Sequence, residues 1–295
     1  EQATGTRSLL RMALIEMSED AVAHAAGADE KKDAQEQLRS LFRDLKADFS
    51  PKNLAPFILL ALGDFIRENT SAPREALVYY AEVLSRSDSG YVCEALYGRA
   101  DVYGRGKVPA ELEKGIADLG EVDRKSTDTF LQEKALRRKI ELHAIAGEWQ
   151  RVAENAGQYL SRFGNHDGTD ADGVSLLLAQ AHEKNDKFDD AILLYETLAF
   201  SRQSKQIRYS SMACRKWMQL LWQRDQTAAD DKPGDRQVAY NGGFRYLENT
   251  REQVLRMSDR DKESWAAVAE LVKDFAASPG ILPMAMPKQS NKKED

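Results

Sequence analysis

Apolar residues recur at helical spacing along most of the chain. Just before residue 199, a stripe at i, i+3, i+4 and i+7 is formed by Ala191, Leu194, Tyr195 and Leu198. An earlier segment, beyond the turn Asn185–Lys187, carries a second stripe formed by Leu177, Leu178, Ala181 and His182. These stripes predict two amphipathic helices. Neither helix can bury its stripe alone, so we expect the two to pack on each other and on neighbouring elements.

The same residue spacing occurs four times, which indicates a repeat. The recurring sets are Ala76/Tyr80/Val83, Gly115/Leu119/Val122, Val152/Ala156/Tyr159 and Ala191/Tyr195/Leu198. Their first members are 39, 37 and 39 residues apart. Three of the preceding segments have a small residue near the middle, and the fourth has Ile140; the small residues are Gly63, Ala100 and Ala179. A period of this length predicts a helical solenoid, with an irregular helical bundle as the alternative.

The last of these units resembles the tetratricopeptide repeat (TPR). Leu178-Ala179 matches the Leu-Gly pair of that family, His182 takes an aromatic position and Phe188 takes the aromatic position of the turn. The spacing of 12 residues from Ala179 to Ala191 is the family spacing. Since a large side chain would overpack a close helix crossing, we expect the two helices to cross at these two alanines. The resemblance extends over roughly residues 52–200 and implies a right-handed α-solenoid of about six helix pairs.

The other units depart from the family pattern. The spacing from Gly63 to Ala76 is one residue too long, and the spacing from Ala100 to Gly115 is three residues too long. Val152 stands where the family has alanine, and the proline that follows the second helix in the family is missing from every unit. The repeats are therefore divergent.

Further stripes extend the all-α prediction towards both ends. We expect helices over 6–24, around Ala34–Leu45, and over Ile207–Gln223, Arg236–Met257 and Lys262–Phe275. The predicted parts are an N-terminal helix pair (1–50), TPR-like repeats (51–200), C-terminal helical repeats or a cap (201–277) and a disordered tail (278–295). The first pair lacks a polar capping unit before it, so we expect it to continue a longer solenoid. Within the tail, the segment Ile281–Met284 is expected to pack back on the last helix.

Composition supports a globular helical protein. Hydrophobic residues make up 42% and charged residues 31% of the chain, with only 18 glycines and 8 prolines among 295 residues. No apolar run approaches the ~18 residues that a membrane span requires, so none is predicted. The net charge of −6 argues against a nucleic-acid partner. The short basic cluster Lys134–Lys139 is flanked by Glu133 and Glu141, which predicts a solvated helix face.

Candidate chemistry is sparse. The loop Phe163–Gly173 lacks the ligands of a calcium loop and is interpreted as an inter-repeat turn with Asx capping. The glycine-rich segment Tyr103–Glu111 lacks the ending of a phosphate loop and is interpreted as a lengthened turn. Cys93 and Cys214 have no metal-like spacing, and both are predicted to be buried, with one long-range disulfide left open. The sequence predicts no enzyme, no cofactor and no metal.

Similarity to the TPR family implies that the first helix of each pair lines a concave groove. Transferred to this sequence, the groove candidates are Asp64, Arg67, Tyr97, Asp101, Arg105, Arg137, Glu141, Gln180, Glu183 and Trp217. The predicted function is a noncatalytic scaffold that holds a protein partner in this groove. The alternative is a spacer or self-associating segment of a larger solenoid. The divergent repeats and the acidic balance resemble bacterial envelope-assembly proteins of the TPR family, which favours the periplasm or envelope, but cytoplasmic members of the family look the same, so the compartment stays open.

Overall fold

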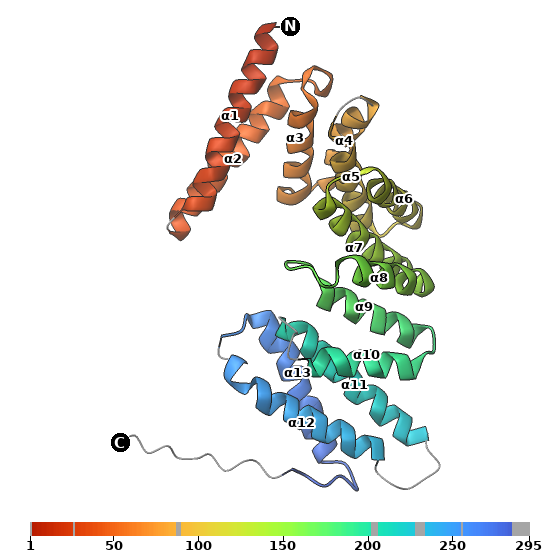
Figure 1. Ribbon diagram of the computed structural model, residues 1–295. Coiled ribbons are helices and arrows are strands. Elements are labelled where there is room, and N and C mark those ends of the chain that lie inside the picture. The colour runs from red at the N-terminus through yellow and green to blue at the C-terminus, as the bar shows by residue number, and fades with distance from the viewer. Residues whose placement is uncertain are drawn as a thin grey trace. The chain divides into compact units, whose positions relative to one another are not determined.

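The computed structural model describes residues 2–25, 27–86, 90–201, 206–227, 234–254 and 256–284. Over these ranges the regular structure is helical, with thirteen α-helices and two short 3-10 helices (Figure 1). The all-α prediction is confirmed. The chain packs as two units, Glu1–Gly147 and Glu148–Asp295, and the boundary falls inside the range predicted as TPR-like repeats. None of the helices in the described ranges is both long and apolar enough to cross a membrane.

Unit 1 contains seven α-helices and two short 3-10 helices, and prolines begin four of these nine helices. The α-helices are α1 (Gln2–His24), α2 (Ala28–Asp48), α3 (Pro56–Asn69), α4 (Ala76–Ser85), α5 (Val92–Gly106), α6 (Pro109–Lys125) and α7 (Thr129–Ala146). Pro51 and Pro73 begin the 3-10 helices Pro51–Asn53 and Pro73–Glu75, and Pro56 and Pro109 begin α3 and α6. Proline suits a first position because its missing N–H has no intrahelical partner there.

Consecutive helices of unit 1 pack on one another, and α5 also packs on α3 and on α7. The crossing of α5 and α6 is close. A Cβ atom added to Gly115 would lie 3.2 Å from the carbonyl oxygen of Ala100. Tyr80 of α4 occupies a similar narrow gap, because added Cβ atoms at Gly63 and Gly98 would lie 2.7 Å and 2.4 Å from its ring. Small residues therefore occupy these helix contacts, where larger side chains would push the helices apart.

The segment Tyr103–Glu111 differs from its prediction. It was predicted as a lengthened turn, but α5 continues to Gly106 and α6 starts at Pro109. Only Lys107 and Val108 separate the helices, with Lys107 in the left-handed conformation at φ 52°. The prediction of a long turn is therefore wrong. The three additional residues of this repeat extend the helices instead.

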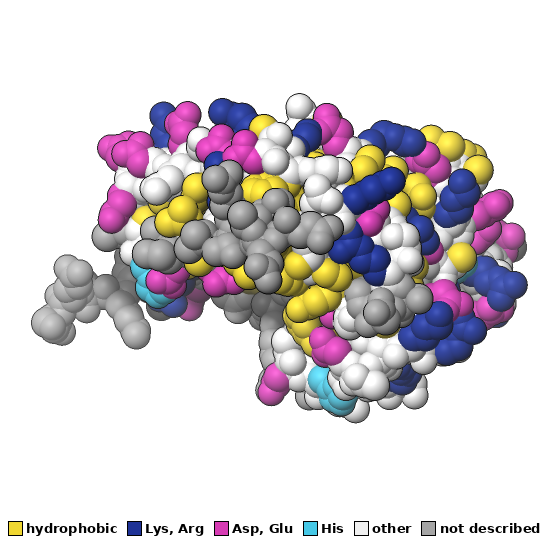
Figure 2. Space-filling model, turned by 90° about the horizontal axis from the view of Figure 1, so that it is seen from above, with side chains coloured by type: hydrophobic (Ala, Val, Ile, Leu, Met, Phe, Trp, Pro, Cys, Tyr) yellow, Lys and Arg dark blue, Asp and Glu magenta, His cyan; other side chains and the backbone are white. Residues whose placement is uncertain are grey.

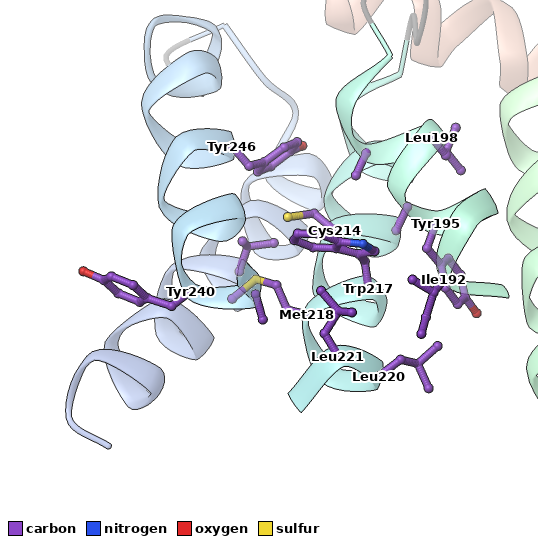
Figure 3. Packing of buried hydrophobic residues seen from close by; sticks show 14 of the residues in the cluster. Ile192, Tyr195, Leu198, Cys214, Trp217, Met218, Leu220, Leu221, Tyr240 and Tyr246 are labelled. Atoms are coloured by element: carbon purple, nitrogen blue, oxygen red, sulfur yellow. The ribbon is translucent and has the colours of Figure 1, made fainter. Parts of the chain in front are cut away.

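Unit 2 contains six α-helices, and four of them pack on α11. The six helices are α8 (Trp149–Phe163), α9 (Ala171–Lys184), α10 (Phe188–Phe200), α11 (Ile207–Thr227), α12 (Gly234–Val254) and α13 (Asp259–Ala276). Helices α9, α10, α12 and α13 all pack on α11. Figure 3 shows side chains of α11 lying between those of α10 and α12. Each helix expected from the sequence at the C-terminal end is therefore present, and α11 is buried on several sides.

Two glycines bring α12 onto the most apolar part of α11. An added Cβ atom at Gly242 would lie 2.4 Å from the ring of Trp217, and one at Gly243 would lie 2.5 Å from the sulfur of Met218. Glycine costs a helix about 1 kcal/mol relative to alanine. The close packing that these positions allow offsets that cost.

The segment after α13 folds back on unit 2. Ile281 is buried in the core, and the Met284 N–H donates to the Tyr240 hydroxyl at 3.1 Å. The Gln237 side chain bonds both backbone groups of Leu282, at 2.8 and 3.0 Å. The segment Ile281–Met284 thus packs back on unit 2, where its hydrogen bonds join it to α12 and Ile281 belongs to the same apolar cluster as Val272 and Phe275 of α13. The prediction of a disordered tail from residue 278 is wrong for 278–284, while 285–295 lie outside the described residues.

Candidate functional site

Most of the predicted groove residues meet on one side of unit 1. Helix α3 carries Asp64 and Arg67, α5 carries Tyr97, Asp101 and Arg105, and α7 carries Arg137 and Glu141. Because α5 packs on both α3 and α7, residues between 34 and 38 positions apart in the chain become neighbours. We call this set, together with Arg138, the α3–α5–α7 face.

Asp101 is the centre of this face. Its carboxylate accepts hydrogen bonds from Arg67 of α3 at 3.3 Å and from Arg105 of its own helix at 2.9 Å, and it forms an ion pair with Arg138 of α7 at 2.8 Å. The side chain of Asp101 is only 13% exposed. Charge-assisted bonds of this kind are short and strong compared with neutral ones. Asp101 therefore ties three helices together through their guanidinium groups.

Arg67 extends the network along α3. Its guanidinium, 10% exposed, also reaches Asp64 at 3.1 Å and Glu68 at 2.7 Å. Tyr80 donates its hydroxyl proton to Asp64 at 2.7 Å. Burial raises the pKa of Asp64, although the bond from Tyr80 and the charge of Arg67 oppose that shift. Arg105 donates to the backbone carbonyl of Arg67 at 2.6 Å, so the side chains of α5 also hold the backbone of α3.

The basic cluster Lys134–Lys139 contributes to this network and is not a simple solvated face. Glu141 accepts from Arg138 at 2.6 Å and from Arg137 at 3.4 Å. Arg138 is 19% exposed, and Ala135 and Leu136 are fully buried. The sequence interpretation missed Arg138. The only available signal was its position one residue after Arg137, on the flank of the helix that turns towards α5.

Tyr97 provides the aromatic surface of the face. The guanidinium carbon of Arg67 lies 6.0 Å from the centroid of its ring. The ring is half-buried, and burial together with the nearby Asp101 carboxylate raises the pKa of the phenol. The phenol therefore stays protonated and can donate a hydrogen bond.

In unit 2, Gln180 and Glu183 lie half-buried on α9. Glu183 accepts from the Tyr195 hydroxyl of α10 at 2.8 Å and from Lys216 of α11 at 3.0 Å. It joins three helices, as Asp101 does in unit 1. The pKa of Tyr195 is raised by burial and by its bond to this carboxylate.

Trp217 does not belong to a groove surface. It is 4% exposed in the core of unit 2, where α12 covers its ring at Gly242. Carrying the repeat register into α11 was wrong at this residue, because α12 and α13 pack on the side that would otherwise be open. Cys214, on the same helix, is fully buried, and burial strongly raises the pKa of its thiol. Cys93 is half-buried, and both cysteines are free thiols.

The loop Phe163–Gly173 is a turn between α8 and α9, as predicted, but its capping differs from the prediction. Asp170 occupies the N-cap position without a side-chain capping bond. Its carboxylate accepts from the Tyr209 hydroxyl at 3.2 Å, and its N–H donates to the Tyr159 hydroxyl at 3.1 Å. The described residues contain no group of three or more His, Cys, Asp or Glu side chains placed to hold a metal ion.

Surface charge is mixed where it can be seen. On the face drawn in Figure 2, Lys and Arg side chains alternate with Asp and Glu, and apolar side chains lie between them. Duplex binding usually relies on a concentrated basic surface.

A pocket between α2 and α3 of unit 1 escaped the sequence interpretation. It combines apolar side chains of both helices with basic side chains of α2, among them Arg39 and Arg43. The signal that was available is their i, i+4 spacing beside the apolar stripe of α2. Comparison with known proteins adds no assignment: no family model matches the chain, and no curated protein matches it significantly.

Proposed function

We propose that the protein is a noncatalytic scaffold whose TPR-like helix pairs form a right-handed solenoid and bind a protein partner. The observation that carries this proposal is the α3–α5–α7 face. It gathers seven of the predicted groove residues from three successive first helices. A half-buried aromatic ring surrounded by charged groups provides an apolar anchor and fixed polar contacts, a combination common at protein interfaces.

The packing within each unit supports the solenoid part of the proposal. The first helix of each proposed pair contacts the first helix of the next pair. In unit 1, α3 contacts α5 and α5 contacts α7, and in unit 2, α9 contacts α11. Small residues stand at the crossing of α5 and α6, and Ala179 and Ala191 are both fully buried. Stacked helix pairs in which each contacts mainly its neighbours are typical of solenoid proteins.

One observation favours the alternative, a spacer or assembly segment. The charges on the α3–α5–α7 face largely satisfy one another, since Asp101 alone binds three arginines. Charged groups that are already paired have less to gain from a partner than free ones. A spacer would need such a network only to hold successive helices in register.

Affinity capture from an extract of the producing organism tests the two functions. The bait is the full chain beside Arg105→Glu/Arg137→Glu, which alters the two more exposed arginines of the face and leaves Asp101 in place. The control is Lys52→Glu/Lys114→Glu, an equal charge change at exposed lysines elsewhere in unit 1. A binder loses its captured protein only in the first variant. Capture of nothing by the wild type, or equal capture by both variants, contradicts the proposed groove.

A further inference from the structure

We infer that the pocket between α2 and α3 of unit 1 binds an acidic peptide that inserts one aromatic or large aliphatic side chain. The pocket has a volume of about 240 Å³. Its walls include Arg39, Phe42 and Arg43 from α2 and Leu62, Phe65 and Ile66 from α3. None of these residues belongs to the α3–α5–α7 face. The inference therefore adds a second site, and this site can bind a ligand even if that face does not.

The base of the pocket is apolar. Phe42 and Phe65 stack across the two helices, with ring centroids 4.0 Å apart. Leu62 and Ile66 are buried beside them, at 1% and 3% exposure. An apolar cavity of about 150 Å³ holds a benzene molecule. A volume of about 240 Å³ therefore has room for one large apolar side chain.

The rim of the pocket is basic. Arg39 and Arg43 lie one turn apart on α2, and both are exposed. In the described part of the chain, neither has an ion-pair or hydrogen-bond partner. Lys46, one turn further on, is paired with Glu75. Arg67 and Arg138 on the α3–α5–α7 face, by contrast, are both bound to carboxylates.

Charge complementarity identifies the occupant. Two free guanidinium groups beside an apolar pocket suit carboxylates that flank an apolar side chain, because arginine binds carboxylates through two parallel hydrogen bonds. The chain as a whole has a net charge of −6, so this positive rim is a local feature. A peptide with acidic residues on both sides of one phenylalanine would fill the pocket and neutralise its rim.

The test measures binding of a synthetic peptide to the full chain by fluorescence anisotropy. The probe is a fluorescein-labelled peptide with one phenylalanine between three glutamates on each side. We expect the matching peptide with serine in place of phenylalanine to bind at least about tenfold more weakly, because one buried aromatic group is lost. Arg39→Glu/Arg43→Glu should weaken binding of the phenylalanine peptide by at least about tenfold.

Two further variants keep the result interpretable. Lys52→Glu/Lys114→Glu changes net charge equally and should alter affinity less than about twofold. Asn69→Trp fills the mouth of the pocket, leaves both arginines in place and should abolish the preference for phenylalanine over serine. Circular dichroism melts of each variant establish that unit 1 is folded.

Several outcomes would overturn the inference. These are equal binding of the two peptides, equal losses in both double variants, no binding at all, and tighter binding of an oligothymidine than of the peptide, which would assign the rim to nucleic acid. Peptide binding retained in Arg105→Glu/Arg137→Glu would show that the pocket acts independently of the α3–α5–α7 face. Failure of one proposal can thus be distinguished from failure of the other.

Discussion

The two units bury their apolar residues in different ways. In unit 1 the buried residues form two clusters, one built from α1 to α5 and one from α5 to α7. In unit 2 one cluster extends from Leu176 to Ile281, with α11 in its middle. In unit 1 the polar sides of α3, α5 and α7 lie next to one another. Asp101 of α5 joins them there through its contacts with arginines of α3 and α7. Unit 2 covers α11 with α12, α13 and the segment that contains Ile281.

This difference shows where the repeat pattern can be extrapolated. A groove-facing position stays accessible only while each helix pair contacts the pairs before and after it. That condition is met by α3, α5 and α7. It fails at α11, where the same register places Trp217 in the core. A surface can therefore be inferred from the repeat in unit 1 but not at the C-terminal end of unit 2.

The largest expected effect comes from breaking the core of unit 2. Trp217→Ala should lower the free energy of unfolding by about 3–5 kcal/mol, because it removes a buried aromatic side chain and leaves a cavity under Gly242. Denaturant unfolding followed by circular dichroism measures this loss. A loss below about 1 kcal/mol, the size typical of a surface substitution, would contradict the buried position.

Asp101→Ala tests the network that distinguishes unit 1. It should cost about 3 kcal/mol, because three arginine side chains lose a shared carboxylate in a mostly buried site. Glu113→Ala, at an exposed carboxylate of α6, is the matched control and should change stability by less than about 0.5 kcal/mol. If both variants melt at the same temperature, the network has no structural role, and its charges are available to a partner.

Ala191→Leu sharpens the comparison at a helix crossing. Ala191 is fully buried, and a larger side chain there should cost about 1–3 kcal/mol by overpacking. Ala266→Leu, at an exposed position of α13, provides the control. A thermal melt that shows no loss for Ala191→Leu relative to this control would count against the predicted register.

The smallest expected effect on stability at neutral pH comes from the buried phenol groups of Tyr80 in unit 1 and Tyr195 in unit 2. Burial raises the pKa of Tyr80 and of Tyr195 above that of a free tyrosine, which is about 10. The folded state therefore keeps protons that the unfolded state releases. The stability that this provides is complete below about pH 10 and is lost as the pH rises further.

The measurement is the free energy of unfolding at several pH values between about 9 and 11. We expect it to fall with pH, and more steeply in the wild type than in Tyr195→Phe, which removes one titrating phenol. Identical slopes in the two proteins would show that Tyr195 ionises in the folded state as freely as in the unfolded one.

Local features were predictable from the sequence, and long-range ones were not. Helix positions follow from apolar stripes and from Pro51, Pro73 and Pro109, whose effects extend over a few residues. Two of the three arginines that Asp101 binds, Arg67 and Arg138, lie on other helices, 34 and 37 residues away in the chain, and no local pattern identifies Arg138 as a partner. The burial of Trp217 depends on packing against α12, and the glycines of α12 did not reveal from the sequence alone that they make room for this ring.

The candidate site likewise combines features that the sequence predicts with features that it does not. The resemblance to the TPR family placed seven residues on one face because it concerns spacing alone, but it could not show that their charges are paired with one another. The α2–α3 pocket lies outside that pattern. Its arginines are spaced correctly for one helix face, yet the pocket exists only because Phe65 and Ile66 of α3 lie opposite.

Site-specific photo-crosslinking in the producing organism tests the central claim, protein binding by the first helices, most directly. A photoreactive amino acid would replace Arg105 or Arg137 on the α3–α5–α7 face, and Glu113 or Lys114 on α6 as controls. The account predicts crosslinks to one protein from the first two positions and none to it from α6. Equal crosslinking from both sets, or none from any position, would contradict the claim and favour a spacer.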